Sequence, residues 1–429
     1  MKESSGALSR GLRLGKLGLS LTGSYLGYQA QNILLSEGQR DQRRRQFQTQ
    51  SARRVREELG ALKGAAMKLG QVLGLQTHAL PEEAIAELAR LQMHAPAMHP
   101  TLARAQFKAS LGADPEVLFR VFEETPFAAA SLGQVHRAWT RSGEKVAVKI
   151  QYPAIRAAIE SDLKLLRSAT LPARFLGHAP GAIIDEVQRG FLEETDYFHE
   201  AGNIEFFRRK LKGLDYLTLP EVQWDLTRER VLTMSFVEGE IMGPFLNKKP
   251  SQAVRNLIGT RLVELYYIQL HRLRALHADH HPGNYLFQPD GHIGLVDFGC
   301  VKRINFDASD LIRSCVGRTW RQGDKQAAHV LRLIFGARVP YAHARKMLPT
   351  LEVMTGILYP EGKHANPVVD FGKEQLLQLL VMTLKKAVRD KLTNPEFAFI
   401  SRAELGLYSL LHQLSAKVNV RATWRRCDL

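Results

Sequence analysis

The sequence predicts an α+β fold in which a helical N-terminal extension precedes a β-rich lobe and then a helical lobe. Three observations indicate this. The chain has 429 residues, more than a single hydrophobic core usually holds. Short apolar runs typical of strands begin near Phe122. After Gly239 the apolar spacing is mainly helical.

Residues 1–55 are assigned to a basic, glycine-containing arm associated with a membrane surface. Two GxxxG spacings, Gly11/Gly15 and Gly23/Gly27, would let helices approach closely and are consistent with a homodimer. Polar residues interrupt the apolar positions, so a surface-lying arm is favoured over an inserted one. The run DQRRRQFQTQSARRVREELG fits either an anionic bilayer or a solvated helix face. No run of about 20 apolar residues predicts an ordinary transmembrane helix.

The rest of the chain divides into three predicted parts. Residues 56–120 form a helical extension, with helical spacing from Glu57 to Leu91 and again from Thr101 to Phe119. Residues 121–239 form the β-rich lobe, with strands over SLGQVHRAWT, KVAVKIQYP, TLPEVQWDL and RVLTMSFV. Residues 240–429 form the helical lobe, interrupted by YLFQPDGHIGLVDFG, which predicts a hairpin that turns at PDG.

Composition narrows the class of partner. The formal charge of +16 fits either a solvated basic surface or attraction to nucleotide, anionic lipid or nucleic acid. Aromatic and basic residues are not interleaved, so no nucleic acid is expected. Cys300, Cys315 and Cys427 are far apart and form no CxxC, so neither a structural zinc site nor a disulfide framework is predicted. A reducing compartment follows from this usage.

Lys149 in the run VAVKIQYP is the first candidate for chemistry. It lies among apolar residues of a predicted strand, where a lysine is costly unless it has a partner. It is either an edge-strand lysine that points to water or a lysine that binds nucleotide phosphates, as in the V-A-I-K motif.

The hairpin before Lys149 occupies the place of a glycine-rich phosphate cover. Ala128, Ala129, Ala130 and Ser131 replace most of the glycines, and only Gly133 remains. Alanine restricts both positive φ and the approach of backbone N–H groups to phosphate. We therefore expect a stiffer loop that holds a terminal phosphate differently. A simple turn of small residues is the alternative.

The acidic segment FLEETDYFHEAGN offers a carboxylate partner for Lys149. Glu194 is favoured for this role and Glu200 is the alternative. Either one could instead belong to a solvated acidic helix face.

The pair HADHHPGN and LVDFG carries the strongest signal. Asp279 and Lys149 are the predicted catalytic residues, and Asp279 would accept or orient a proton or position a phosphate. Asn284 and Asp297 offer the hard oxygen ligands that Mg²⁺ prefers. A strand lysine, H-x-D-x4-N and DFG follow one another in the order that phosphoryl transfer requires. The histidines His277, His280 and His281 could suggest zinc, but a second ligand cluster is missing, so zinc is not favoured.

Two expected features are absent. Ala278 stands where H-R-D has an arginine, and no A-P-E follows DFG. The groups that handle phosphate are therefore predicted to be present, whereas the platform for a protein substrate is not.

Taken together, these motifs resemble the UbiB/ADCK family of atypical kinases. The matching stretches are AAMKLGQ, AAAS with SLGQVHRA, VAVKIQYP, EETDYFHEAGN, HADHHPGN, LVDFG and the C-terminal NPEFAFISRAELGLYSLL. The resemblance implies a protein-kinase-like bilobal fold whose KxGQ helix lies over the active site. It also implies an ATPase-like activity connected with ubiquinone biosynthesis at membranes, and a preference for ADP over productive use of ATP.

The resemblance also assigns individual residues. It places Lys68 and Gln71 near the nucleotide, and we count Met234 and Val237 with the nucleotide-binding residues. His280 departs from the family's HADPHPGN, where a proline pre-sets φ. The cofactors expected are ATP or ADP with Mg²⁺, in a cytoplasmic protein peripheral to a bacterial or mitochondrial inner membrane. Its partners would be anionic lipids and quinone-biosynthesis proteins.

The prediction from sequence is an atypical kinase or ATPase that supports isoprenoid-quinone biosynthesis. Two alternatives stay open: a nucleotide-binding pseudokinase scaffold, and a kinase for a small molecule.

Overall fold

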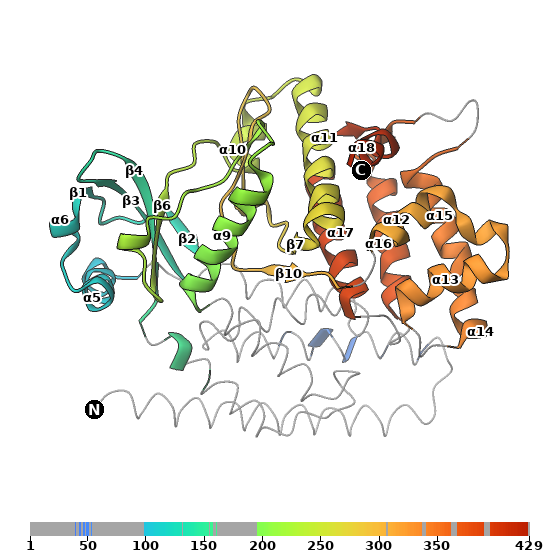
Figure 1. Cartoon of the computed structure of the whole chain (residues 1–429), viewed down its shortest axis with the longest axis horizontal. Coiled ribbons are helices and arrows are strands. Elements are labelled where there is room, and N and C mark those ends of the chain that lie inside the picture. Colours follow the sequence, from blue (N-terminus) through green and yellow to red (C-terminus); the bar gives the residue numbers. More distant parts are fainter. Residues whose placement is uncertain are drawn as a thin grey trace. The chain divides into compact units, whose positions relative to one another are not determined.

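The computed structural model describes residues 98–427, apart from 131, 154, 158–159, 161–194, 306–307, 337–339, 362–366 and 390–394, together with scattered positions between 39 and 53. The chain divides into two compact units (Figure 1). Unit 1 comprises Met1–His199 and Val222–Ser235, and unit 2 comprises Glu200–Glu221 and Phe236–Leu429. The domain boundaries assigned from the sequence stay predictions.

Unit 1 is built on an antiparallel five-stranded sheet. Strands β1, β3, β4 and β6 lie side by side in that order, and β2 pairs with β3. The predictions of strands over SLGQVHRAWT, KVAVKIQYP and RVLTMSFV are confirmed. The strands are β1 (Phe119–Phe122), β2 (Ala128–Ala130), β3 (Gly133–Thr140), β4 (Lys145–Gln151) and β6 (Val231–Ser235).

Helix α5 (Pro100–Leu111) covers this sheet and helps to form its core. Phe107 of α5 is fully buried together with Val148 and Val231 of the strands. The single helix predicted from Thr101 to Phe119 is wrong, because the chain turns at Gly112. Gly112 has φ of +81°, and its N–H caps α5 by donating to the Lys108 carbonyl. Helix α6 (Pro115–Leu118) and β1 follow it.

The strand predicted over TLPEVQWDL is also wrong. The two-residue β5 (Leu217–Thr218) ends at the first residue of this stretch, and its last three residues form a 3₁₀ turn, η2 (Trp224–Leu226). Pro220 lacks the N–H that a ladder would need. Val222 makes a single isolated bridge to Met234.

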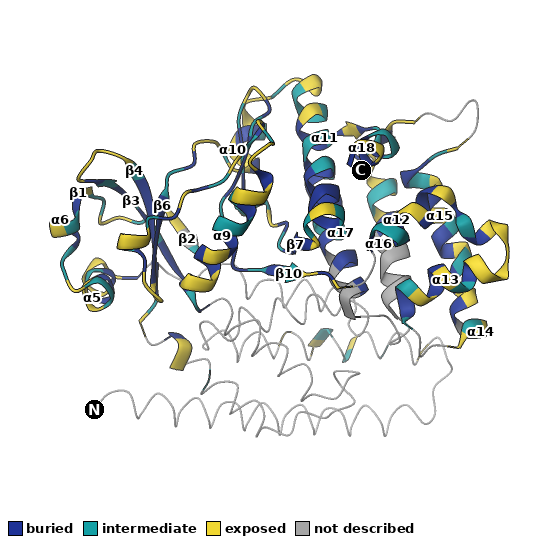
Figure 2. Ribbon diagram, viewed as in Figure 1, coloured by how far each residue is buried: buried dark blue, intermediate teal, exposed yellow. Residues whose placement is uncertain are grey.

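Unit 2 is mainly helical, and α9 (Tyr197–Leu211) enters it from unit 1. Figure 2 shows the buried residues along α11, whose inner face includes Leu262, Val263 and Tyr266. Its other helices are α10 (Met242–Asn247), α11 (Gln252–Ile268), α12 (Ala308–Gly317), α13 (Asp324–Phe335), α14 (Tyr341–Ala344), α15 (Leu348–Leu358), α16 (Glu374–Arg389), α17 (Pro395–Gln413) and α18 (Val420–Cys427).

Three small sheets interrupt the helices of unit 2. The hairpin predicted around PDG is confirmed, because β8 and β9 pair antiparallel and Gly291 has φ of +87°. Strand β5 pairs with β9, β7 pairs with β10, and β11 pairs with β12. Their bounds are β7 (Ala275–His277), β8 (Tyr285–Phe287), β9 (Ile293–Leu295), β10 (Val301–Arg303), β11 (Val369–Asp370) and β12 (Lys417–Val418).

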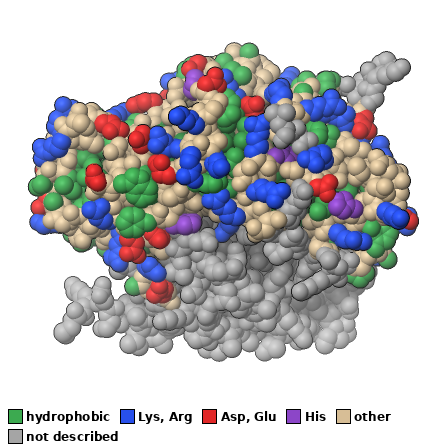
Figure 3. All heavy atoms as spheres, in the orientation of Figure 1, with side chains coloured by type: hydrophobic (Ala, Val, Ile, Leu, Met, Phe, Trp, Pro, Cys, Tyr) green, Lys and Arg blue, Asp and Glu red, His purple; other side chains and the backbone are tan. Residues whose placement is uncertain are grey.

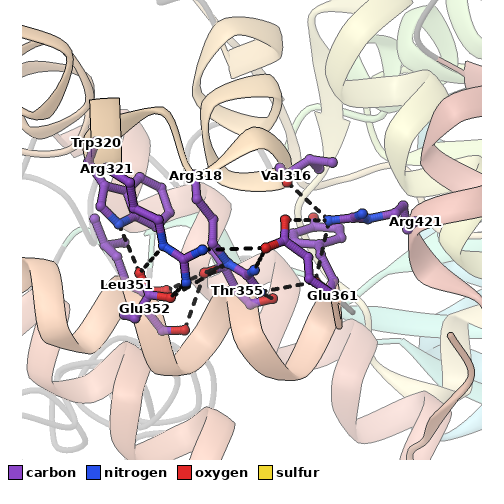
Figure 4. A network of polar contacts seen from close by, with 10 residues as sticks. Val316, Arg318, Trp320, Arg321, Leu351, Glu352, Thr355, Glu361 and Arg421 are labelled. Atoms are coloured by element: carbon purple, nitrogen blue, oxygen red, sulfur yellow. Dashed lines mark hydrogen bonds and ion pairs between the residues drawn. The ribbon is translucent and has the colours of Figure 1, made fainter. Parts of the chain in front are cut away.

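A buried arginine anchors the segment that follows DFG, where no A-P-E exists. Arg318, 5% exposed, forms an ion pair with Glu361 and donates to the carbonyl oxygens of Thr355 and Tyr359 (Figure 4). Arg421 of α18 also binds Glu361, at 3.0 Å. A buried guanidinium is tolerated only when it is paired and hydrogen-bonded in this way. The turn after α12 is therefore tied to α15 and to the C-terminal helix.

The first prediction concerns Gly133. A Cβ at this position would lie 2.2 Å from the Ile150 carbonyl oxygen and 3.0 Å from the Tyr197 hydroxyl. Because the nearest atom belongs to the backbone, Gly133→Ala is expected to lower the free energy of unfolding by about 1–3 kcal/mol. Urea unfolding measures the loss. Gly213→Ala is the control, since nothing lies within 4 Å of its Cβ. Equal stability of the two variants would contradict the prediction.

Candidate functional site

Lys149 is a buried residue of a central strand. It pairs with Val135 of β3 on one side and with Leu232 of β6 on the other, and it is 5% exposed. The reading of Lys149 as an edge-strand lysine in water is therefore excluded. Its ammonium lies 5.2 Å from the centre of the Tyr197 ring. A cation over an aromatic face is attracted by the ring's quadrupole, so Tyr197 helps to hold the charge inside the protein.

The alanine-rich segment is itself part of the sheet. Ala128 and Ala130 of β2 pair with Val135 and Gly133 of β3. Gly133, the one glycine retained, lies so close to the β4 backbone at Ile150 that no Cβ fits. Strand packing therefore explains why this position holds a glycine. Ser131 lies outside the described residues.

Helix α9 presents three side chains to the phenylalanine of DFG. Glu200, 1% exposed, accepts a hydrogen bond from the Phe298 N–H at 3.5 Å. Asn203 donates to the Phe298 carbonyl at 3.0 Å, and the Phe207 ring lies 5.3 Å from the Phe298 ring. Together these contacts hold Phe298 along its backbone and its ring.

Sequence reasoning considered Glu200 but missed Asn203 and Phe207. Residues 200, 203 and 207 recur at i, i+3 and i+7, which places them on one face of a helix. This spacing was the available signal. Glu194, the favoured partner of Lys149, lies outside the described residues, so the choice between Glu194 and Glu200 stays a prediction.

The loop HADHHPGN brings Asp279 and Asn284 together. The Asn284 side-chain amide donates to Asp279 Oδ2 at 3.0 Å and to the Asp279 carbonyl at 3.1 Å. These two bonds close the loop on itself and fix the direction of the Asp279 carboxylate. The amide nitrogen of Asn284 is used here, so its oxygen is the atom it can offer to a cation.

The DFG segment is joined to this loop by further bonds. The His277 ring donates through Nε2 to the Asp297 carbonyl. The Ala278 N–H donates to the Cys300 carbonyl at 2.9 Å, and the Val296 N–H donates to the Asn284 carbonyl at 3.2 Å. His277 is therefore a positioning residue for the segment that carries Asp297. The sequence had offered it only as a candidate for zinc.

The three polar residues of this cluster suit an oxygen-seeking cation. Asp279, Asn284 and Asp297 are all half-buried, so a ligand can reach them. Asp297 Oδ1 accepts from the Gly299 N–H at 3.0 Å, which orients its carboxylate. One carboxylate and one amide oxygen are the donor types that Mg²⁺ takes from proteins, usually with waters and phosphate oxygens completing the shell. In the described part of the chain, no three His, Cys, Asp or Glu side chains gather as metal ligands.

His280, which the sequence left unexplained, is a packing residue. It is 7% exposed, and its ring stacks on Tyr285 with centroids 6.0 Å apart. The rings of Tyr266 and His277 meet it edge-on at 6.2 and 6.1 Å. The position at which the resemblance led us to expect a proline thus holds a buried aromatic ring.

The other predicted site residues are placed as follows. Met234 lies in β6, pairs with Ala147 and is 5% exposed. Val237 is 7% exposed and packs in unit 2 against Gly294 of β9, where a Cβ would lie 2.6 Å from Val237 Cγ1. Lys68 and Gln71 lie outside the described residues, so the place of the KxGQ motif stays a prediction.

Glu404 of α17 has a carboxyl group whose pKa is raised above that of an ordinary glutamate. Removal from water raises the pKa of its carboxyl to about 7. Burial first, and then the charge of Glu404, raise the pKa of the Tyr266 phenol well above its ordinary value. A carboxylic acid that titrates near neutrality therefore lies close to an aromatic neighbour of His280. No sequence pattern indicated this, since a single glutamate on a helix is usually solvated.

Comparison with known proteins agrees with this geometry. The sequence model of the ABC1 atypical kinase-like domain matches residues 90–331. A solved structure, the complex of Rv3197 with erythromycin from Mycobacterium tuberculosis, superposes with a TM-score of 0.58. It is 27% identical and covers 85% of this chain and 92% of that chain. The predicted kinase-like α+β fold is confirmed.

Curated relatives match a shorter part of the chain. Protein ACTIVITY OF BC1 COMPLEX KINASE 7, chloroplastic, of Arabidopsis thaliana is 34% identical over 271 residues, 62% of this chain and 39% of that protein. AarF domain-containing protein kinase 1 of Mus musculus is 34% identical over 60% of this chain and 50% of that protein. Probable protein kinase UbiB of Aeromonas hydrophila is 34% identical over 59% of this chain and 48% of that protein. The matched stretches therefore span half or less of these relatives.

The second prediction follows from Glu404. Its folded pKa of about 7 lies above the ordinary value of 4.5, so the fold favours the protonated acid. Stability from this group is present at low pH and is lost as pH rises from about 4.5 to about 7. Between pH 5 and pH 8 the loss is on the order of 2 kcal/mol.

Urea unfolding of Glu404→Gln tests this, because glutamine stays neutral throughout. Relative to this variant, the wild-type protein is expected to lose stability as pH rises from 5 to 8. Glu229→Gln, at an exposed position, should follow the wild-type protein. Parallel pH profiles for Glu404→Gln and the wild-type protein would refute the assignment.

Proposed function

The chain belongs to the ABC1 atypical kinase-like family, and on this premise we propose that it is a Mg²⁺- and nucleotide-dependent atypical kinase or ATPase that supports isoprenoid-quinone biosynthesis. The family places the chain in the phosphoryl-transfer class. The quinone connection follows from the resemblance to UbiB/ADCK proteins. The observation that carries the nucleotide-dependent activity is the hydrogen-bonded pair Asp279–Asn284, joined through the backbone and His277 to the segment that bears Asp297.

Each residue has a stated role in the proposal. Lys149 binds the α- and β-phosphates, oriented by a carboxylate at Glu194 or Glu200. Asn284 and Asp297 hold the cation, which neutralises charge on the phosphate oxygens. Asp279 orients the attacking water or hydroxyl group, and Asn284 keeps its carboxylate in one direction. Such catalysis relies on positioning and electrostatics more than on covalent chemistry.

The alanine-rich strand supports a form of this activity in which ATP is turned over slowly. Because Ala128 and Ala130 are paired in the sheet, their backbone N–H groups have less freedom to close over a terminal phosphate than a glycine loop has. This favours nucleoside diphosphate binding over rapid turnover of ATP. The absent A-P-E and the alanine at 278 argue against a protein substrate.

The third prediction concerns Asp297. Asp297→Asn removes the carboxylate charge while keeping the side-chain shape, so ATP hydrolysis is expected to fall by about 100-fold or more. The Mg²⁺-dependent rise in melting temperature with ADP or ATP is expected to disappear, since a ligand that binds only the folded state raises apparent stability. Phosphate release and thermal unfolding measure the two effects.

Asp225→Asn is the matched control, because this carboxylate is exposed on η2. It should hydrolyse ATP and bind nucleotide as the wild-type protein does. The proposal is wrong if Asp297→Asn retains wild-type hydrolysis together with Mg²⁺-dependent nucleotide binding.

Phosphate release and transfer of labelled phosphate separate the two alternatives. A pseudokinase scaffold would bind nucleotide with no phosphate release, in the presence or absence of anionic vesicles. A kinase for a small molecule would transfer labelled phosphate to a product, and Asp279→Ala would abolish the transfer.

Association with a membrane surface is also proposed, through the basic run near the N-terminus. The formal net charge of the chain is +16. Figure 3 shows basic and acidic side chains interspersed on the coloured part of one face. The basic run contains RRR at 43–45, largely outside the described residues. Among the helices that the structure describes, none is both long and apolar enough to cross a bilayer.

The fourth prediction tests this association. Replacing Arg43 and Arg44 by glutamine is expected to weaken binding to anionic vesicles by about 1 kcal/mol per charge at low salt. Flotation with phosphatidylserine-containing and with purely zwitterionic vesicles measures it. Arg425→Gln with Arg426→Gln removes the same charge elsewhere and should bind like the wild-type protein. Equal losses in both double variants would indicate a general charge effect and would reject the assignment to the arm.

A further inference from the structure

Asp279 lies between two buried neighbours that fix its backbone. On one side Ala278 is 2% exposed, and its N–H donates to the Cys300 carbonyl. On the other side His280 is 7% exposed, and its ring packs on Tyr285 and Tyr266. Asp279 itself is half-buried. Because neighbouring residues share one backbone, a shift of His280 displaces the Asp279 carboxylate.

The backbone of α17 closes the site that receives His280. A Cβ placed on Gly406 would lie 2.8 Å from the His280 Cβ and 3.6 Å from its Cα and Cγ. Ordinary side chains do not approach so closely, so the helix can pack against the loop only because residue 406 is glycine. In a helix interior, glycine costs about 1 kcal/mol relative to alanine. The close approach gives a reason for glycine at this position.

We infer that α17 is a positioning element of the catalytic loop, which acts through the contact between Gly406 and His280. The inference rests on the proposed function, because it concerns how Asp279 is held for phosphoryl transfer. It extends the site beyond residues 90–331, the part matched by the family model, to a helix near the C-terminus. Gly406 touches no reacting group; it sets how deeply His280 is seated, and His280 sets the position of Asp279.

The contact also gives His280 a role that a proline cannot fill. A proline fixes φ of its own residue through its ring. His280 instead fixes the loop from outside, by packing between β8, α11 and α17. His280 is thus held by tertiary contacts with three elements, one of which is distant in sequence.

The fifth prediction tests the contact with Gly406→Ala in the full chain. The added methyl group displaces His280, so the Mg²⁺ concentration for half-maximal ADP binding is expected to rise about tenfold and the rate of ATP hydrolysis to fall by a similar factor. The measurements are made at a temperature where every variant is folded. Gly243→Ala is the control, because nothing lies within 4 Å of its Cβ in α10; it should bind as the wild-type protein does.

A second substitution distinguishes a specific contact from general damage. His280→Gly removes the Cβ that the new methyl group meets, whereas His280→Ala keeps it, and both remove the imidazole ring. The two double variants are therefore compared with each other: Gly406→Ala/His280→Gly should bind Mg²⁺–ADP more tightly than Gly406→Ala/His280→Ala. Wild-type binding by Gly406→Ala, or no difference between the two double variants, would overturn the inference.

Amide hydrogen exchange separates this inference from the proposed function. The N–H groups of Ala278 and Asn284 are hydrogen-bonded in the loop. Without any nucleotide, Gly406→Ala is expected to exchange faster at these two amides. If the wild-type protein binds no Mg²⁺–nucleotide, the proposed function fails, and the exchange rates alone decide whether α17 positions the loop. Unchanged rates would then reject it.

Discussion

The hydrogen bond from His277 to the Asp297 carbonyl is the interaction on which the candidate site depends. It joins two segments that are separate in the sequence, the strand β7 with its loop and the DFG segment. Antiparallel pairing of β7 with β10 brings the segments together, and the buried imidazole then fixes their spacing. Asn284 completes the arrangement from the loop, because it binds Asp279 with its side chain and Val296 with its carbonyl. Without this junction, Asp279 and Asp297 would be carboxylates on unrelated loops.

The residues around this junction are held by packing, hydrogen bonds and ion pairs. Ala278 is buried where related motifs carry an arginine that can receive a phosphorylated loop. Phe298 is held by Asn203 and Phe207 of α9. The segment after DFG is anchored by Arg318, a buried cation with paired acids. Each of these contacts is made within unit 2 and requires no modification of the chain.

The sequence predicted the parts of the site that are written in contiguous motifs. Lys149, Asp279, Asn284 and Asp297 could be found because each stands at a fixed place in a short pattern. The strands β3, β4 and β6 were found in the same way, from the alternation of their residues. Gly112 was missed as a helix terminus because helical spacing continues on both sides of it.

What could not be predicted depends on contacts between distant residues. Asn203 donates a hydrogen bond to the Phe298 carbonyl, 95 positions away in the sequence, and no local pattern predicts such a bond. No sequence pattern links Gly406 to His280. Their close approach in the folded chain explains why residue 406 is glycine. The raised pKa of the Glu404 carboxyl follows from its burial in the folded chain, which no local sequence pattern predicts.

The packing of α11 has a consequence for where this protein can be divided. Gly259 lies on the buried face of α11, and a Cβ there would lie 2.5 Å from the Ala416 side chain and 3.1 Å from that of Val418. Residues beyond the family match thus form one side of the core around the central helix of unit 2. A fragment cut at residue 331 would lack Ala416 and Val418, would expose the surface of α11 against which they pack, and would be prone to aggregate. The part of the chain that the family model matches ends at residue 331, whereas unit 2 extends to Leu429.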